Sequence, residues 1–173
     1  MALVNADLYE GKGRRALERV NAAWQSLSRS LLRRIQLIRI EGWQFRARAT
    51  LAVVVETGDT TLLPSVERDA RRVAREGAPF SHAMAQLLTA AVAWQHGRES
   101  QALAKLREAV AGFESAELVL AAVATRWTLG RALGGDEGLR LCSEAEKWML
   151  GQSIRVPERV ARMVAPGFER RVA

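Results

Sequence analysis

Few residues of this chain have the types and spacing that chemistry requires. His82 and His96, the two histidines, have no cysteine or carboxylate at metal-ligand spacing. We expect both to be structural, because His82 lies near a predicted helix start and His96 at a helix end, where the dipole favours histidine. Cys142, the single cysteine, has no base or second cysteine nearby and is expected to be a buried thiol on an apolar helix face.

The sequence also lacks the motifs of phosphoryl transfer. Gly11 and Gly13 are followed by Arg14-Arg15 and by no other part of a nucleotide fingerprint, so we interpret them as turn glycines. No glycine-rich phosphate loop precedes a strand, and neither the catalytic-loop Asp-to-Asn spacing nor an Asp-Phe-Gly motif occurs. We therefore predict a protein that is not an enzyme, with no catalytic residues, no cofactor and no metal ligands.

Two groups of arginines are candidates for binding. One lies on a single face of a predicted helix, where it could bind acidic groups, and consists of Arg68, Arg71, Arg72 and Arg75. Because Glu67 and Glu76 stand four residues from arginines of this face, local ion pairs favour a solvated face over a binding site.

The second group places a tryptophan between two arginines along one side of a helix, at Arg39, Trp43 and Arg46. These side chains could line a concave peptide groove in which arginine recognises carboxylates. The alternative is that neighbouring helices cover Trp43 while both arginines form ion pairs within the chain.

Composition places few limits on partners. The chain has 173 residues, 49% of them hydrophobic and 26% charged, which fits one domain with a sizeable core. A net charge of +7 permits acidic protein, nucleic-acid or anionic-membrane partners. A single cysteine favours a reducing compartment, and no secretory signal or membrane-length apolar run is present. We expect a cytoplasmic protein with no membrane partner.

The stretch 31–58 organises the predicted fold, because on a helix it shows two opposed apolar stripes. One stripe holds Leu31, Ile35, Ile38, Gly42, Phe45, Ala49, Ala52 and Val53; the other holds Leu37, Ile40, Ala47, Leu51 and Val54. A helix that covers one core needs a single apolar face, whereas two faces suit a helix between two layers.

Helical periodicity covers the remainder of the chain, and no stretch alternates as a strand does. Ser65, Ser115 and Asp136 are predicted to cap helices, while Pro79 and Pro157 are placed in first turns. The predicted helices are 2–9, 12–28, 31–57, 65–76, 79–96, 99–114, 115–133, 136–150 and one that opens at Pro157.

Two internal echoes suggest repeats. The pattern Gly-x4-Ala-Leu-x2-hydrophobic-x2-Ala begins at Gly11 and again at Gly97, and Trp-x2-Gly-Arg occurs at Trp94 and at Trp127, 33 residues later. That offset is close to the period of about 34 residues in tetratricopeptide arrays. We predict an all-α fold of antiparallel helix pairs, stacked as a short tetratricopeptide-like right-handed solenoid. Residues 1–173 would be one domain of a longer array, with 1–10 ending a truncated helix and 153–173 forming a C-terminal cap.

A set of short motifs towards both ends of the chain accompanies the repeats: Trp24, Ser30-Leu31-Leu32, Gln36, Arg39-Ile40, Arg46-Ala47-Arg48, Gly134-Gly135-Asp136, Trp148-Met149, Ile154-Arg155, Pro157-Glu158-Arg159 and Met163-Val164-Ala165-Pro166-Gly167-Phe168. With these motifs, the repeats resemble the tetratricopeptide-like C-terminal regions of large bacterial serine/threonine protein kinases, which join a kinase domain, an NTPase module and helical repeats. The resemblance implies a non-catalytic regulatory segment that binds other domains of its parent protein or a signalling partner. It supplies no site residues.

The leading hypothesis is therefore a protein-interaction segment of a bacterial signalling protein, which could also form a homodimer through an uncapped end of the array. A basic helical nucleic-acid-binding module is the alternative, and it depends on net charge alone. The third hypothesis is an enzyme whose site is assembled from scattered residues. It is the least favoured, because few acid, base or nucleophilic groups lie on apolar stretches.

Overall fold

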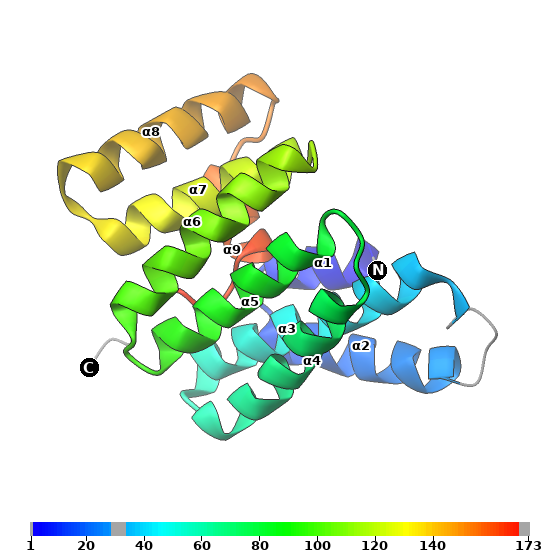
Figure 1. Cartoon of the computed structure of the whole chain (residues 1–173). Coiled ribbons are helices and arrows are strands. Elements are labelled where there is room, and N and C mark those ends of the chain that lie inside the picture. Colours follow the sequence, from blue (N-terminus) through cyan, green and yellow to red (C-terminus); the bar gives the residue numbers. More distant parts are fainter. Residues whose placement is uncertain (1, 29–33, 170–173) are drawn as a thin grey trace.

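The computed structural model describes residues 2–28 and 34–169, and Figure 1 shows that they form an all-helical molecule. No residue in these two ranges is in a strand, as predicted. The described helices are α1 (Ala2–Tyr9), α2 (Gly13–Ser28), α3 (Gln36–Thr57), α4 (Leu63–Arg75), α5 (Ser81–Gln95), α6 (Glu99–Ser115), α7 (Val119–Leu133), α8 (Gly135–Gly151) and α9 (Pro157–Val164), with a 3-10 turn, η2, at Thr60–Leu62.

Each helix from α1 to α8 packs against the next one in the chain, so the molecule is a series of sequential, antiparallel-like pairs. The exception is α9, which returns to contact α7, α1 and, more lightly, α8. The C-terminal segment thereby joins the two ends of the series, and Figure 1 places it between the α1–α3 group and α7.

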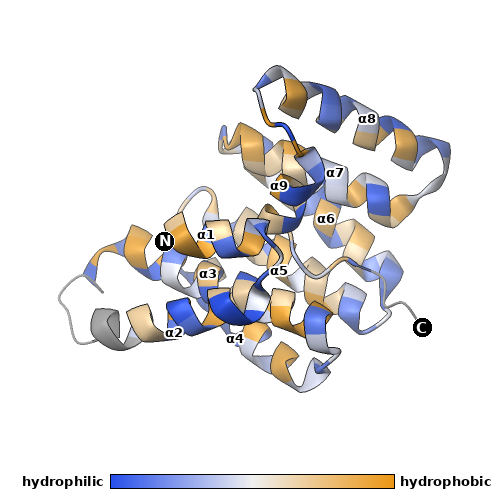
Figure 2. Ribbon diagram, turned by 180° about the vertical axis from the view of Figure 1, so that it is seen from behind, coloured by the Kyte–Doolittle hydropathy of each residue, from blue (hydrophilic) through white to orange (hydrophobic). Residues whose placement is uncertain are grey.

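The later part of both apolar stripes of α3 packs into buried clusters, which confirms that this helix lies between two layers. Phe45 and Ala49 pack in a cluster with Val20 of α2 and with residues of α1. On the opposite side, Leu51 and Val54 belong to a cluster with residues of α4 and α5. Figure 2 shows hydrophobic and hydrophilic residues interspersed along the ribbons of the helices.

The buried part of α3 is shorter than predicted. Ile35 and Leu37 are 49% and 51% exposed, so burial begins at Ile40 on one side of the helix and at Gly42 on the other. Leu31, where the helix was predicted to begin, lies outside the described residues.

The first sequence echo corresponds to a repeated structure. α1 and α5 end alike: Gly11 and Gly97 adopt positive φ angles of 71° and 73°. After each glycine, the next amide donates a 6→1 hydrogen bond, from Lys12 to Asp7 O and from Arg98 to Ala93 O. Alanines on α2 and α6 at matching positions, Ala16 and Ala102, are fully buried. The second echo does not correspond, because Gly97 ends a helix whereas Gly130 lies within α7.

Three predicted helix caps are wrong. Ser65 lies inside α4, Ser115 is the last residue of α6, and Asp136 is in the first turn of α8, which Gly134 precedes. The error at Ser115 has a physical cause: α6 ends through Glu117, which takes the left-handed conformation (φ 57°) that usually signals glycine. Pro79 also lies before α5 rather than in it, whereas Pro157 opens α9 as predicted.

The C-terminal segment is anchored by a buried cation. The Arg48 guanidinium on α3 donates through Nε to the backbone oxygen of Met163 at 2.9 Å, near the last turn of α9, and through Nη2 to Asn5 Oδ1 at 3.2 Å. Burial lowers the pKa of Arg48 to about 10. A cation at a helix C-terminus complements the partial negative charge of the dipole. Residues 153–169, predicted as a cap, thus lie against α1, α3, α5 and α7.

Candidate functional site

Arg39, the first residue of the predicted groove, is already engaged within the chain. Its Nε and Nη2 donate to the two carboxylate oxygens of Glu76 at 2.8 and 2.6 Å, joining α3 to the end of α4. The bonds from Arg39 are the main reason that the pKa of Glu76 is lowered. A partner carboxylate would have to compete with this bidentate pair.

Arg46 and Trp43 are also covered by neighbours. Arg46 donates through Nε and Nη2 to both oxygens of Asp69 at 2.7 and 2.5 Å, and its guanidinium lies 4.6 Å from the ring centre of Trp24. Trp43 packs at the edge of an apolar cluster between α3, α4 and α5, with Arg72 over its ring. These side chains are therefore arranged as in the alternative given above, with Trp43 covered and both arginines in ion pairs within the chain. Partner binding at Arg39, Trp43 and Arg46 stays a prediction.

The predicted basic face of α4 is divided between surface and interior. Arg68, Arg71 and Arg75 are exposed, and Arg71 pairs with Glu67 at 3.8 Å. Arg72 is half-buried and lies 3.4 Å from Asp69. The exposed members form a solvated face, and nothing in their geometry concentrates them around a cavity.

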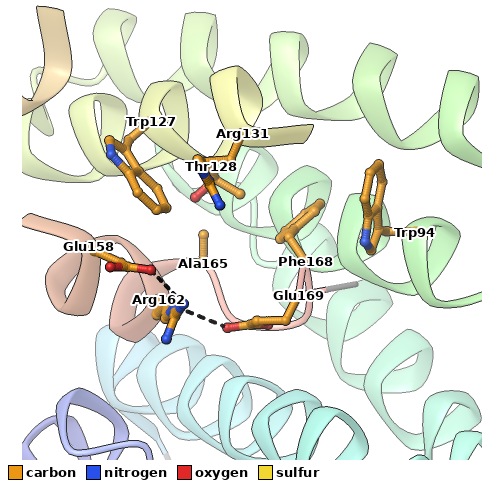
Figure 3. A pocket seen from close by; sticks show the side chains of 9 residues that line it. All are labelled: Trp94, Trp127, Thr128, Arg131, Glu158, Arg162, Ala165, Phe168 and Glu169. Atoms are coloured by element: carbon orange, nitrogen blue, oxygen red, sulfur yellow. Dashed lines mark hydrogen bonds and ion pairs between the residues drawn. The ribbon is translucent and has the colours of Figure 1, made fainter. Parts of the chain in front are cut away.

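The described residues do contain a pocket that no sequence pattern had assembled. It has a volume of about 340 Å³ and lies where α5, α7, α9 and the segment after α9 meet. Figure 3 shows its walls, which are formed by Trp94, Trp127, Thr128, Arg131, Glu158, Arg162, Ala165, Phe168 and Glu169. This volume is at the lower end of those of ligand sites, and it suits one or two side chains of a larger molecule.

The charges around this pocket are unevenly paired. On the α9 side, Arg162 donates to Glu158 at 2.5 Å and lies 3.8 Å from Glu169, so its charge is compensated twice (Figure 3). On the α7 side, Arg131 is exposed and forms no ion pair with any residue in ranges 2–28 and 34–169. Its guanidinium lies 5.7 Å from the ring centre of Trp127. Arg131 is therefore the cation of the pocket that is available to a ligand.

Aromatic side chains give the pocket its apolar surface. Trp94 and Trp127 are largely buried, and the indole Nε1 of Trp127 donates to Glu146 at 2.8 Å, which fixes its orientation. Phe168 is tilted against Trp94 with ring centres 6.1 Å apart. A ligand would thus contact the Phe168 ring and the exposed edges of the two indoles.

The segment that carries Phe168 is held firmly. Gln95 Nε2 donates to the backbone oxygen of Gly167 at 2.7 Å. A Cβ on Gly167 would lie 3.1 Å from Ala91 Cβ and 3.2 Å from a methyl carbon of Leu51, and its φ is +101°. Glycine is therefore strongly favoured at this position. The segment that carries Phe168 thus forms a well-packed wall of the pocket.

Two further cavities flank α9. One, of about 320 Å³, shares Arg162 and Glu169 with the pocket, and the other, of about 610 Å³, shares Trp127, Arg131 and Glu158. The larger one lies along α7 and α8 and includes Cys142 in its walls. Burial is the main reason that the pKa of the Cys142 thiol is raised, which makes the thiol a poor nucleophile at neutral pH.

The predicted structural histidines lie away from this pocket. His82 and His96 are both exposed, and His82 Nε2 is 3.0 Å from the amide nitrogen of Gln86. Within the described ranges, no group of three or more His, Cys, Asp and Glu side chains could hold a metal ion. The described helices also include none with the length and apolar content that a membrane crossing needs.

Sequence reasoning missed the pocket because its walls come from distant segments. The echo at Trp94 and Trp127 contained two of its aromatic residues, and Arg131 belongs to the same motif. Nothing local linked that motif to Arg162 and Phe168. Comparison with models of protein families, with curated proteins and with solved structures finds no match for this chain.

Proposed function

We propose that this chain is a non-catalytic protein-binding module, a short tetratricopeptide-like solenoid that serves as a regulatory segment of a bacterial signalling protein. The observation that carries the proposal is the pocket at Trp127 and Arg131, where aromatic walls lie beside an arginine with no carboxylate partner among the described residues. Aromatic and arginine side chains are the types that most often anchor a protein interface.

Selection of peptides from a random library displayed on phage tests this proposal. We expect the intact chain to enrich peptides with a shared motif, and the variant Arg131→Gln to lose them. Arg98→Gln is the matched control, since Arg98 is an exposed arginine that is not among the pocket walls. Failure to enrich any motif, or enrichment that Arg131→Gln leaves unchanged, would contradict the proposed site.

A salt titration with generic DNA and RNA separates this function from the nucleic-acid alternative. Phosphate contacts produce a steep dependence of affinity on salt. Suppose that the chain binds DNA or RNA with a steep salt dependence, and that this binding is lost when Arg68, Arg71 and Arg75 are replaced with glutamine. That result would favour the nucleic-acid alternative and count against a protein-binding role.

A homodimer through the α8 end is a second way in which the module could use a protein partner. α8 packs on α7, and Leu139 and Leu150 of α8 are 70% and 57% exposed. Sedimentation velocity over a range of concentrations tests this. Association that Leu139→Glu abolishes supports it, and a monomer at every concentration contradicts it.

A further inference from the structure

We infer that the pocket binds a partner segment in which an aromatic residue is followed by an acidic one, with the carboxylate paired to Arg131. This inference rests on the proposed function and goes beyond it, because it names the chemistry of the bound segment. Its structural basis is an aromatic–acidic pair that the chain itself already places at one side of the same pocket.

That internal pair is Phe168–Glu169. The Phe168 ring packs against Trp94, and the Glu169 carboxylate lies 3.8 Å from Arg162 Nε. Figure 3 shows the two side chains diverging from one turn of backbone, the ring toward the indole and the carboxylate toward the guanidinium. On one side of the pocket, a tryptophan and an arginine thus hold an aromatic side chain and its neighbouring carboxylate.

The opposite side of the pocket also offers a tryptophan and an arginine, Trp127 and Arg131. This arginine is paired with neither of the pocket's two glutamates. Trp127 and Arg131 are within 5.7 Å of each other, measured from guanidinium carbon to ring centre. Both carboxylates that line the pocket, from Glu158 and Glu169, are directed to Arg162 instead. An incoming carboxylate would thus form an ion pair with Arg131, the one arginine of the pocket walls that has no carboxylate partner among the described residues.

The remaining space and the charge also favour this ligand. A volume of about 340 Å³ is enough for one aromatic side chain, which would lie between the Phe168 ring and the edge of Trp127. A planar guanidinium both pairs with a carboxylate and stacks on an aromatic ring, so Arg131 can contact both parts of the segment. The net charge of +7 favours approach of an acidic partner.

A capped Gly-Ser-Phe-Glu-Ser-Gly peptide is the probe, and the full chain is titrated with it while tryptophan indole N–H signals are followed by NMR. The signals of Trp127 and Trp94, assigned with Trp127→Phe and Trp94→Phe, should shift on binding. The signal of Trp43, which is outside the pocket walls, serves as the internal control. Since a charge-assisted hydrogen bond is involved, we expect Arg131→Gln to weaken binding about tenfold.

Replacement of glutamate by glutamine in the probe completes a double-mutant cycle. The Phe-Gln probe should bind the intact chain about tenfold more weakly, and Arg131→Gln should then cause no further loss. Arg98→Gln, an exposed arginine outside the pocket, should leave all affinities unchanged, and thermal unfolding verifies that each variant is folded.

Three outcomes overturn the inference: no shift of Trp127 at millimolar probe, additive effects of the two substitutions, or binding only of a control peptide that ends in phenylalanine with a free terminal carboxylate. The last outcome would assign the site to chain ends rather than acidic side chains. If phage selection enriches an unrelated motif that still requires Arg131, the inference fails while the proposed function stands.

Discussion

The buried ion pair of Arg46 and Asp69 allows a quantitative prediction about the interior of the molecule. The Asp69 side chain is 2% exposed and the Arg46 side chain 22%. Removal of one partner of a buried pair costs about 3–5 kcal/mol, because the other charge is left without compensation. Here Arg46 is partly solvated and Arg72 stays 3.4 Å from the same carboxylate, so we expect Arg46→Met to cost about 2–3 kcal/mol.

Thermal and urea unfolding, followed by circular dichroism, measure this cost. In a chain of this length, about 1 kcal/mol corresponds to about 2–4 °C, so the expected loss predicts a fall in Tm of about 4–12 °C. Arg71→Met is the matched control, because Arg71 is 62% exposed and its pair with Glu67 is 3.8 Å long. We expect that variant to lose less than about 0.5 kcal/mol.

The double variant Arg46→Met with Asp69→Leu separates the ion pair from packing. Replacing both charges leaves no uncompensated carboxylate, so this variant should be more stable than Arg46→Met alone. A loss below about 0.5 kcal/mol for Arg46→Met, or a double variant at the sum of the two single losses, would refute the reasoning. The first of these results would also mean that the Arg46 side chain is available to bind a partner.

Three other predictions concern pH, reactivity and packing. The hydrogen bond from Arg39 lowers the pKa of Glu76 below its ordinary value of 4.5. The contribution of this pair to the free energy of unfolding is therefore present at neutral pH and is lost as the pH falls through the folded-state pKa of Glu76. Urea unfolding of the intact chain and of Arg39→Gln should give stabilities that converge in acid. Burial raises the pKa of Cys142 above 9.0, so iodoacetamide should modify it more slowly than free cysteine, and equal rates would contradict the buried position. A Cβ at Gly130 would lie 2.6 Å from a backbone oxygen of α8, so Gly130→Ala should cost about 1–3 kcal/mol by urea unfolding. The control Gly151→Ala, with nothing within 4 Å of its Cβ, should cost nothing, and equal losses would contradict this.

The fold class was predictable where burial leaves a periodic mark on the sequence. Two apolar stripes on one helix need two covering layers, and both stripes of α3 are buried or half-buried from Ile40 onward. Helix ends were predictable where glycine forms the turn, as at Gly11 and Gly97. At Glu117 and Ser153 the same left-handed turn is made by residues that carry no such signal, so the start of α7 was misplaced.

Ion-pair partners could be predicted only in part. Pairing of Arg39 and Arg46 within the chain was one of the two sequence alternatives. Their partners are Glu76, at the end of α4, and Asp69, within α4, and spacing within one helix cannot identify a carboxylate on another. Glu76 had been assigned to an arginine of its own helix, whereas the structure pairs it with Arg39. The rule for neighbours four residues apart holds for exposed side chains and fails where a second helix offers better geometry.

The position of α9 was the least predictable feature, and the pocket depends on it. The contact that fixes its end joins Arg48 to the backbone oxygen of Met163, 115 residues away, and a backbone oxygen has no sequence signature. An eight-residue helix is too short to be stable alone, so its place is decided by what it covers. Since α9 and the segment after it supply one wall of the pocket, Trp127 and Arg131 become a site only once this segment has packed between α1 and α7. The proposed binding chemistry is therefore a property of the tertiary structure, and we expect that α7 alone, with the same two residues, would not hold an aromatic–acidic segment.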